Sequence, residues 1–514
     1  MGKVGDAVST NNNIQQVNNN VQTTEKTGNT EVKTSTTIPV ENTNGAEKVN
    51  DLKTFGIRIK DKITGLFGGE TPPTEVFNKE ATVTRTGGQV IIDAGKGDDQ
   101  IGVSQDAKGN VTVTVNGESQ TFSGADRNNL VIRAGEGNDN IWVDENVTVN
   151  LRLAGGDGDD FIRGGGGHDK LEGGAGNDRL HGNGGNDYIN GSVGDDIIYG
   201  DTGNDTVYGG DGADTLYGND GNDYLEGSKG NDTVYGNDGN DTISGGIGDD
   251  NLNGNYGDDV LYAGQGTDTL NGDDGNNRIF SQKGDVNQQN TGGINNTVVT
   301  VELKGNPGGT GVIVTGSDEF RERVEADLEM LRSSPTGRQM LTSFDEAQQN
   351  DGVTVTIQEL PNENNGYADW ENRLKPTQPQ PNLNPTTGAI GTPNSATISY
   401  NPQFAPTFEF TDGTEAYTPP VNVLFHEMGH AYDYTHGTFR AEIYNGNDTN
   451  DSGRNLRVGE RVAAGLPIDH DNDPKTAERT DDANHPDELT ENALREEMNL
   501  QIRTSYIIAR MTKV

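Results

Sequence analysis

Cysteine is absent from this chain of 514 residues, and basic residues are scarce. Without cysteine there is no disulfide framework and no thiolate metal site, so any metal must be held by oxygen or imidazole ligands. The 38 Lys and Arg stand against 81 Asp and Glu, a net charge of −43. Such an excess argues against nucleic acid or an anionic membrane as a main partner. Cations are therefore the first candidates to neutralise it.

Long apolar runs are also missing. Apolar residues make up 29% of the chain, too few for one dense core over this length. No stretch approaches the roughly 18 consecutive apolar residues of a membrane span, and the first residues lack the apolar segment of a secretory signal peptide. We expect no transmembrane segment, and a route without a cleaved leader if the protein leaves its cell.

Proline is missing from the whole stretch between Pro73 and Pro307, whereas ten of the 18 prolines lie between Pro361 and Pro420. A long glycine-rich stretch without proline favours continuous strand pairing, in which every backbone N–H is used. The two regions are therefore expected to fold in different ways.

Composition divides the chain further. Residues 1–50, rich in Asn, Thr, Gln and Ser, predict a disordered leader. Residues 51–153 predict short strands that cap or extend the domain after them. Residues 154–280 carry the repeats described next, and 281–317 are expected to be connecting strands. Residues 318–514 mix helical and strand patterns and predict an α+β domain.

A nonapeptide repeats 14 times without insertion between residues 155 and 280. With GGDGDDFIR as the first unit, the fourth position is always Gly and the eighth is always aliphatic. The sixth position is Asp in thirteen units and Asn277 in the last. The thirteen aspartates are Asp160, Asp169, Asp178, Asp187, Asp196, Asp205, Asp214, Asp223, Asp232, Asp241, Asp250, Asp259 and Asp268.

The chemistry of this repeat points to calcium. Glycine tolerates positive φ, so each unit can make a tight turn that aims carbonyl oxygens inward, and the aspartate adds a carboxylate beside them. Oxygen ligands alone suit Ca²⁺, which takes about 6–8 of them, better than Zn²⁺ or Mg²⁺. Short parallel strands then stack as an all-β solenoid with two units per coil. A flexible glycine-rich linker, the alternative, would not keep an aliphatic residue at every ninth position.

The pattern GGxGxDxUx resembles the calcium-binding RTX repeat, and the resemblance implies a parallel β-roll. The repeat segment holds 26 Asp and Glu against five Lys and Arg, about half of the chain's excess charge. We expect repulsion to keep the roll unfolded without cation, so that several structural Ca²⁺ ions drive its folding. Extracellular calcium modules bind at about 10⁻⁴–10⁻³ M, so folding is expected outside the cell. Related half-motifs at Asp98, Asp99 and Asp139 predict wider, earlier coils.

The C-terminal third contains an HExxH motif, His426 to His430, in a helix predicted to begin at Pro420. Two imidazoles four residues apart lie on one helical face and can bind one Zn²⁺, with Glu427 as general base for water at the open position. The competing interpretation is surface histidines on a helix. Two observations favour the zinc site. A predicted strand precedes the helix, and five of the seven histidines lie between His426 and His485.

A hydrolytic zinc site needs a third protein ligand, and two residues compete for this position. Glu460, thirty residues beyond the motif, would lie on a second helix after a loop, and we favour it. His436 matches the last position of HExxHxxGxxH, but Asp433 stands where that pattern needs Gly. Asp433, Asp469 and His470 are further candidates.

Five separated blocks resemble metallopeptidase family 91, secreted zinc endopeptidases that are bacterial effectors. The blocks are SSPTGRQML, ISYNP, PPVNVLFHEMGHAYD, GERVAAGLP and LTENALREEMNLQIRTSY, within residues 318–506. The resemblance implies a zincin-like α+β fold, zinc at His426 and His430, Glu427 as general base, and a ligand or structural role for Glu460. It also implies protein substrates, host proteins among them, and delivery by bacterial secretion machinery.

We therefore expect a secreted zinc endopeptidase with a calcium-binding roll, acting as an effector or toxin. The alternative is a non-catalytic, calcium-dependent adhesin or binding protein whose peptidase domain is degenerate.

Overall fold

The computed structural model describes part of the chain in detail. The described residues are 20–26, 29–35, 74–76, 81–288, 296–302, 305–359, 374–376, 393–400, 407–409, 415–417, 419–436, 489–500 and 510–512. The chain divides into two compact units, Met1–Thr71 and Pro72–Val514. In the first, β1 (Asn20–Lys26) and β2 (Asn29–Ser35) pair as an antiparallel hairpin. The rest of the expected leader lies outside the described residues, so its disorder stays a prediction.

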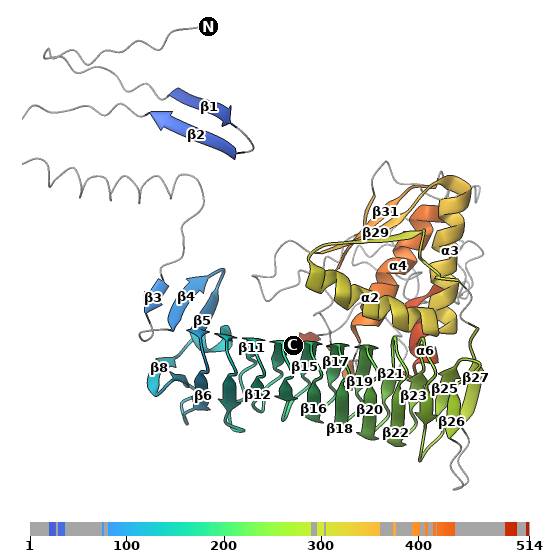
Figure 1. Cartoon of the computed structure of the whole chain (residues 1–514), viewed down its shortest axis with the longest axis horizontal. Helices are drawn as coiled ribbons and strands as arrows, with labels where there is room; N and C mark the ends of the chain where they lie inside the picture. Colours follow the sequence, from blue (N-terminus) through green and yellow to red (C-terminus); the bar gives the residue numbers. More distant parts are fainter. Residues whose placement is uncertain are drawn as a thin grey trace, which may run out of the picture. The chain divides into compact units, whose positions relative to one another are not determined.

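A parallel β-solenoid opens the second unit, as the long row of short strands in Figure 1 shows. Each strand pairs in parallel with the strand one coil later, so that Leu153 stands beside Leu171 and Ile162 beside Leu180. This register places two nonapeptides in each coil, and the 14 units therefore make seven coils. Both the turns and the strands stack in register because the repeat has no insertions.

Two sheets form the sides of this roll. The first contains β12 (Phe161–Arg163), β14 (Arg179–His181), β16 (Ile197–Thr202), β18 (Thr215–Asp220), β20 (Thr233–Asp238), β22 (Asn251–Tyr256), β24 (Thr269–Asn271) and β26 (Val286–Gln288). The second contains β13 (Lys170–Ala175), β15 (Tyr188–Val193), β17 (Thr206–Asp211), β19 (Tyr224–Lys229), β21 (Thr242–Ser244), β23 (Val260–Tyr262), β25 (Arg278–Ser281) and β27 (Thr297–Thr300). We call the first the open sheet and the second the docked sheet, because helices pack on the outer face of the second.

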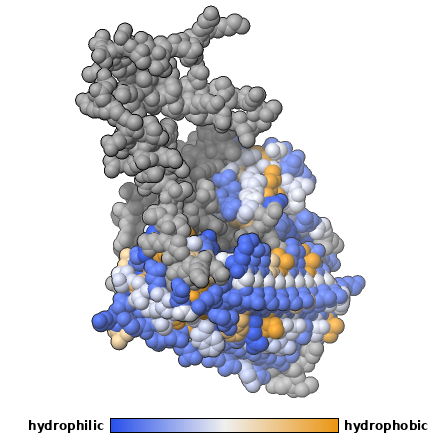
Figure 2. All heavy atoms as spheres, turned by 60° about the vertical axis from the view of Figure 1, so that its left-hand side comes forward, coloured by the Kyte–Doolittle hydropathy of each residue, from blue (hydrophilic) through white to orange (hydrophobic). Residues whose placement is uncertain are grey.

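The core of the roll is one residue wide. The aliphatic residue at the eighth position of each unit, from Ile162 to Ile279, is at most 1% exposed. Side chains alternate across a strand, so the seventh and ninth positions point outward. Figure 2 shows the result at the surface, where hydrophilic residues run in regular rows across the roll. A core this thin explains how the roll forms from so few apolar residues.

Wider coils precede the repeats. They consist of β5 (Gln89–Lys96), β6 (Gln100–Gln105), β9 (Leu130–Glu136), β10 (Asn140–Val143) and β11 (Arg152–Asp157), with the short helix η1 (Asp126–Asn128) before β9. Gly95 pairs with Gly135 and Gly135 with Gly156, so these coils belong to the same solenoid but hold longer turns.

Antiparallel strands close this end of the roll. They are β3 (Thr74–Val76) and β4 (Thr82–Thr86) beside β5, and β7 (Val111–Val115) and β8 (Glu118–Phe122) beside β6. Both sheets therefore end in antiparallel pairing, which interrupts the parallel stack. Residues 51–73 of the expected cap lie outside the described part of the chain.

An α+β domain follows the roll. Its main sheet has the order β28 (Val312–Thr315), β29 (Val355–Glu359), β31 (Ala396–Tyr400) and β30 (Leu374–Pro376), with only β30 antiparallel. Its helices within the described residues are α2 (Asp318–Ser333), α3 (Pro335–Asp351), α4 (Pro420–His436) and α6 (Glu491–Glu497). A small sheet joins β32 (Thr407–Glu409), β33 (Glu415–Tyr417) and β34 (Arg510–Thr512). The predicted order, a parallel β-roll and then an α+β domain, is confirmed.

Helix α4 begins at Pro420, as the sequence predicts. Its apolar residues Leu424, Phe425 and Met428 are fully buried in the core of the α+β domain. Burial of this face fixes how the helix presents the side chains between these positions. Within the described residues, no helix is both long and apolar enough to cross a membrane.

Candidate metal centres

The sixth-position aspartates form two ladders along the two turn edges of the roll. All thirteen are at most 3% exposed. One oxygen of each carboxylate is held by the backbone of the neighbouring coil: Asp196 Oδ1 accepts the N–H of Asp178 at 2.7 Å, and Asp223 Oδ1 accepts that of Asp205 at 2.8 Å. The backbone thus positions every carboxylate in the same way, coil after coil.

The second oxygen of these carboxylates points to a cation. In twelve of the thirteen aspartates Oδ2 is buried without a hydrogen-bond partner, and only Asp169 Oδ2 accepts a bond, from the N–H of Gly165 at 2.7 Å. A buried carboxylate oxygen without a donor is costly unless a positive charge lies beside it. The repeated oxygens are therefore a donor set that suits Ca²⁺.

Carbonyl oxygens converge on the same place. A Cβ built on Gly173 would lie 2.2 Å from Asp178 Oδ2 and 2.7 Å from the carbonyl oxygen of Gly191. The first-position glycine thus leaves room where carboxylate and carbonyl oxygens meet. The fourth-position glycine has another role: Gly176 has a φ of 133°, and a Cβ there would lie 2.2 Å from the carbonyl oxygen of Gly158. Only glycine allows turns to stack so closely.

Asn277, the one asparagine in the ladders, shows how the same position looks without an anionic oxygen. Its Oδ1 accepts the N–H of Asp259 at 2.7 Å, as an aspartate would. Its Nδ2 donates to the carbonyl oxygen of Gly272, also at 2.7 Å. The amide therefore satisfies its own surroundings, whereas the aspartates leave an oxygen for a cation.

The raised pKa values of the ladder aspartates also indicate a site for a cation. Burial raises the pKa of Asp160 to about 6, that of Asp178 to about 7 and that of Asp232 to about 9. Desolvation is the largest cause in each case, and the charges of neighbouring aspartates add to it. A bound divalent cation would compensate the buried negative charge and favour the ionised form.

Two further aspartates extend the ladder that contains Asp160. In the wider coils, Asp139 Oδ1 accepts the N–H of Asp99 at 2.7 Å, and Asp160 Oδ1 accepts that of Asp139 at 2.8 Å. The Oδ2 atoms of Asp99 and Asp139 are buried without partners, like those of the repeats. The sequence carries their signal in GKGDD and GEGND, although no regular nonapeptide surrounds them.

The HExxH helix is the second candidate centre. On α4, His426 and His430 are 7% and 5% exposed, and their ring centroids lie 4.9 Å apart at an interplanar angle of 86°. Glu427 is only half-buried. Two buried imidazoles one helical turn apart suit two of the ligand positions of a zinc ion, and the half-buried carboxylate beside them suits a proton carrier.

The third ligand is not decided by the described residues, which contain no group of three or more His, Asp or Glu suited to a metal. Glu460, Asp469 and His470 lie outside them. His436 ends an unbroken α4, ten residues after His426 and so about 15 Å further along the axis. Its Nδ1 lies 2.9 Å from the carbonyl oxygen of Tyr432. This position argues against His436 as a ligand of the same ion as His426, and the choice of Glu460 stays a prediction.

A buried ion pair near the start of α4 was not predicted from the sequence. Arg323 and Asp327 of α2 form an ion pair of 3.2 Å, with side chains 7% and 0% exposed. Tyr400, at the end of β31, lies beside them. Their spacing of four residues is common on exposed helices, so it carries no signal of burial.

Comparison with known protein families supports the interpretation of both the repeats and the α+β domain. Residues 309–506 match the model of the M91 peptidase family, described as an effector protein. Four matches to the RTX calcium-binding nonapeptide repeat cover residues 152–180, 181–216, 217–252 and 244–279. No curated protein matches the chain. The repeats therefore form a calcium-binding roll, and an effector peptidase domain follows it.

Proposed function

We propose that this chain, an M91-family effector peptidase domain joined to an RTX calcium-binding roll, is a secreted zinc-dependent endopeptidase that cleaves protein substrates. The observation that carries the proposal is the pair of buried imidazoles on α4, 4.9 Å apart, with Glu427 accessible beside them. The matches to an effector peptidase and to calcium-binding repeats support it.

The residues of the site divide the chemistry between them. His426, His430 and, as our favoured third ligand, Glu460 would hold a zinc ion. When bound, the ion supplies Lewis acidity that polarises the scissile carbonyl and makes water a better nucleophile. Glu427 takes a proton from the attacking water and delivers it to the leaving amine. Glu427 is less buried than the two histidines, which suits a residue that exchanges protons with substrate and solvent.

Secretion follows from the calcium dependence of the roll. The ladders need a cation for their buried oxygens, and calcium is abundant outside cells. We propose that the chain is exported unfolded and that the roll folds after export, with host proteins among the substrates of the peptidase domain. The absence of cysteine suits this route, since no disulfide has to form.

The substitution Glu427→Gln tests the proposed function. The amide keeps the shape of the side chain but cannot accept a proton, so cleavage should fall by about 10²–10⁴-fold while zinc content is unchanged. Substrates can be found by incubating the protein with a proteome, calcium and zinc, and by mapping new N-termini. Glu118→Gln, the same change at an exposed residue of β8, is the matched control. A Glu427→Gln variant that cleaves at the wild-type rate would contradict the mechanism.

Two further measurements decide between the alternatives. A zinc-selective chelator should abolish cleavage and leave the calcium-loaded roll folded, whereas a calcium-dependent adhesin would show no cleavage to abolish. Zinc content should fall in Glu460→Ala and stay unchanged in His436→Ala if Glu460 is the third ligand.

A further inference from the structure

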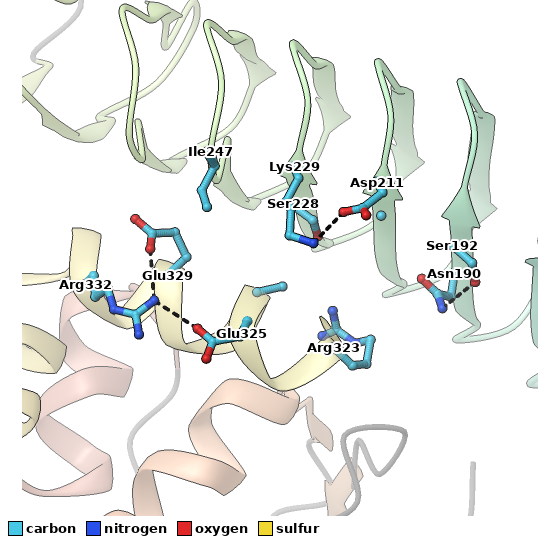
Figure 3. Close-up of a pocket in the computed structure, with 12 residues that line it drawn as sticks. Asn190, Ser192, Asp211, Ser228, Lys229, Ile247, Arg323, Glu325, Glu329 and Arg332 are labelled. Atoms are coloured by element: carbon cyan, nitrogen blue, oxygen red, sulfur yellow. Dashed lines mark hydrogen bonds and ion pairs between the residues drawn. The ribbon is translucent and has the colours of Figure 1, made fainter. Parts of the chain in front are cut away.

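The outer face of the docked sheet is buried from β15 to β23, although the roll itself leaves that face outside. Tyr208 and Tyr262 occupy the ninth position of their units and are 0% exposed. They belong to the same buried cluster as Val324 and Leu328 of α2, so the peptidase domain covers them. Residues of α2 and of the docked sheet also line one pocket between them, as Figure 3 shows. The roll therefore contributes side chains to the core of the peptidase domain.

Arg323 makes the central contact of this interface. Its guanidinium carbon lies 3.1 Å from the centroid of the Tyr208 ring, and its Nη2 lies 3.2 Å from Asp327 Oδ1. A buried cation is tolerated only when its neighbours compensate the loss of water. Here Asp327 supplies the opposite charge and Tyr208 supplies the face of an aromatic ring. Part of these surroundings therefore comes from the roll.

Asp327 continues the chain of contacts toward the HExxH helix. Its Oδ2 lies 3.0 Å from the hydroxyl oxygen of Tyr400, and that hydroxyl lies 2.9 Å from the carbonyl oxygen of Pro420. Tyr400 is fully buried, and Pro420 is the first residue of α4. Four side chains thus connect the docked sheet to the start of the helix that carries His426.

A second connection runs through α6. Glu497 Oε1 accepts the hydroxyl of Tyr262 at 3.0 Å, and Glu497 Oε2 accepts the backbone N–H of Thr336 in the first turn of α3, also at 3.0 Å. The guanidinium of Arg278 donates to the carbonyl oxygen of Glu496 at 2.7 Å. The roll thus contacts α2 and α6 directly and α3 through Glu497.

We propose that the roll is a built-in, calcium-dependent activator of the peptidase, which fixes the start of α4 through Tyr208, Arg323, Asp327 and Tyr400. Only a folded roll presents Tyr208 to Arg323, so calcium acts on the peptidase site without binding there. Arg323, Asp327 and Tyr400 are positioning residues. The effect on cleavage rests on the proposed function. The effect of the roll on the order of α4 does not, because hydrogen exchange measures it without a substrate.

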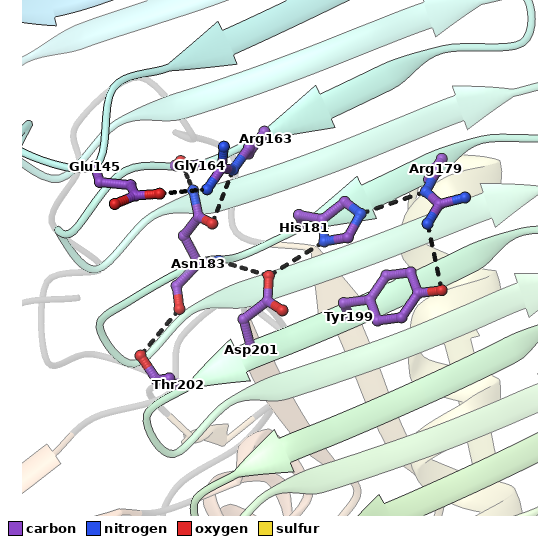
Figure 4. A network of polar contacts seen from close by, with 9 residues as sticks. All are labelled: Glu145, Arg163, Gly164, Arg179, His181, Asn183, Tyr199, Asp201 and Thr202. Carbon is purple, nitrogen blue, oxygen red and sulfur yellow. Dashed lines mark hydrogen bonds and ion pairs between the residues drawn. The ribbon is translucent and has the colours of Figure 1, made fainter.

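The roll offers a matched pair of tyrosines for the test. Tyr208 and Tyr217 hold the ninth position of successive units, Tyr208 on the docked sheet and Tyr217 on the open sheet. Tyr217 stacks between Tyr199 at 4.8 Å and Tyr235 at 5.1 Å, and it is only partly buried. Figure 4 shows Tyr199 on this open face, with Arg179 beside it. Tyr208→Leu and Tyr217→Leu therefore both remove a ring from the roll, but only the first removes the contact with Arg323.

The first readout is amide hydrogen exchange of residues 420–436 in the full chain during a calcium titration, with circular dichroism reporting the roll. Protection of α4 should rise together with folding of the roll in the wild type and in Tyr217→Leu. In Tyr208→Leu the roll should fold with calcium, but α4 should exchange about tenfold faster than in the wild type. Equal protection of α4 in all three proteins, or protection of α4 that does not depend on calcium, would overturn the proposal.

The second readout is cleavage. Tyr400→Phe keeps the buried ring and removes only the hydroxyl, so kcat should fall about tenfold with KM unchanged. An unchanged kcat would overturn the positioning role of Tyr400. If the wild type cleaves nothing with zinc and calcium present, the proposed function fails, and the exchange experiment still decides whether the roll fixes α4.

Discussion

The roll and the peptidase domain are stabilised in different ways. The roll has one buried aliphatic residue in each nonapeptide, and its other inward groups are carboxylates and backbone. The peptidase domain packs helices on a sheet around a broad apolar core that includes Leu341, Phe344 and Phe425. The apolar core is thus narrow in the roll and broad in the peptidase domain. In our account the first region uses metal to fold, and the second uses it to react.

Calcium removal should separate the two regions most strongly. With a chelator present, we expect the roll to unfold completely, because repulsion between the stacked carboxylates is no longer compensated. The core of the peptidase domain should lose only part of its protection, since its apolar contacts remain. Hydrogen exchange across the full chain measures both at once. If the amides of the roll stay protected from exchange without any divalent cation, the proposed dependence of the roll on metal is wrong.

Acidity should partly replace calcium in the roll. The folded roll raises the pKa of its aspartates from 3.8 to about 6 for Asp160 and about 9 for Asp232, so the metal-free folded state binds protons that the unfolded chain releases. Its stability is therefore greatest below the unfolded pKa and is lost as the pH rises through the range from about 6 to 9. Circular dichroism of calcium-free protein should show more roll structure at acidic than at neutral pH.

Calcium binding should show the opposite pH dependence. Because calcium needs the ionised carboxylates, its affinity should fall as the pH is lowered through the same range. A calcium affinity that does not change between neutral and acidic pH would mean that the buried aspartates are not the ligands.

A single methyl group should disturb the roll through its turns. In Gly176→Ala the new Cβ meets the carbonyl oxygen of Gly158 and the backbone is held at a φ of 133°, so we expect a loss of about 1–3 kcal/mol. The calcium concentration at the midpoint of folding should rise accordingly. Gly102→Ala in β6 is the control, since nothing lies within 4 Å of its Cβ. Equal midpoints for the two variants would contradict the close stacking of turns.

The smallest effect is expected when one ladder aspartate is replaced by asparagine, the residue that already stands at position 277. Asp223→Asn should copy Asn277, whose amide donates to a carbonyl oxygen at 2.7 Å. The metal-free roll should then be slightly more stable, because one buried charge is gone, and the protein should bind less calcium. Calcium content and the chelator midpoint measure the two changes. A variant with unchanged calcium content would show that Asp223 is not a ligand.

The roll could be predicted almost completely from the sequence, since each nonapeptide contacts only its neighbours and repeats the same positions. The docking of the two regions could not. Tyr208 and Tyr217 stand at the same position of successive units, yet only Tyr208 is fully buried. What distinguishes them is α2, which lies far along the chain. Local sequence does not record such a contact.

The candidate peptidase site was predictable in part for a similar reason. His426 and His430 are four residues apart on one helix, so local geometry brings them together. A ligand from a distant segment depends on the path of the intervening chain. Glu460 therefore stays a prediction, and Tyr400 and Asp327 emerged only from the fold.

The most direct test of this account is the metal content of the full chain and of His426→Ala, measured by mass spectrometry after equilibration with zinc and calcium. The wild type should hold a single zinc ion and several calcium ions. His426→Ala should lose the zinc and keep the calcium together with the circular dichroism of the roll. Zinc retained by the variant, or zinc and calcium lost together, would contradict two separate metal centres with different tasks.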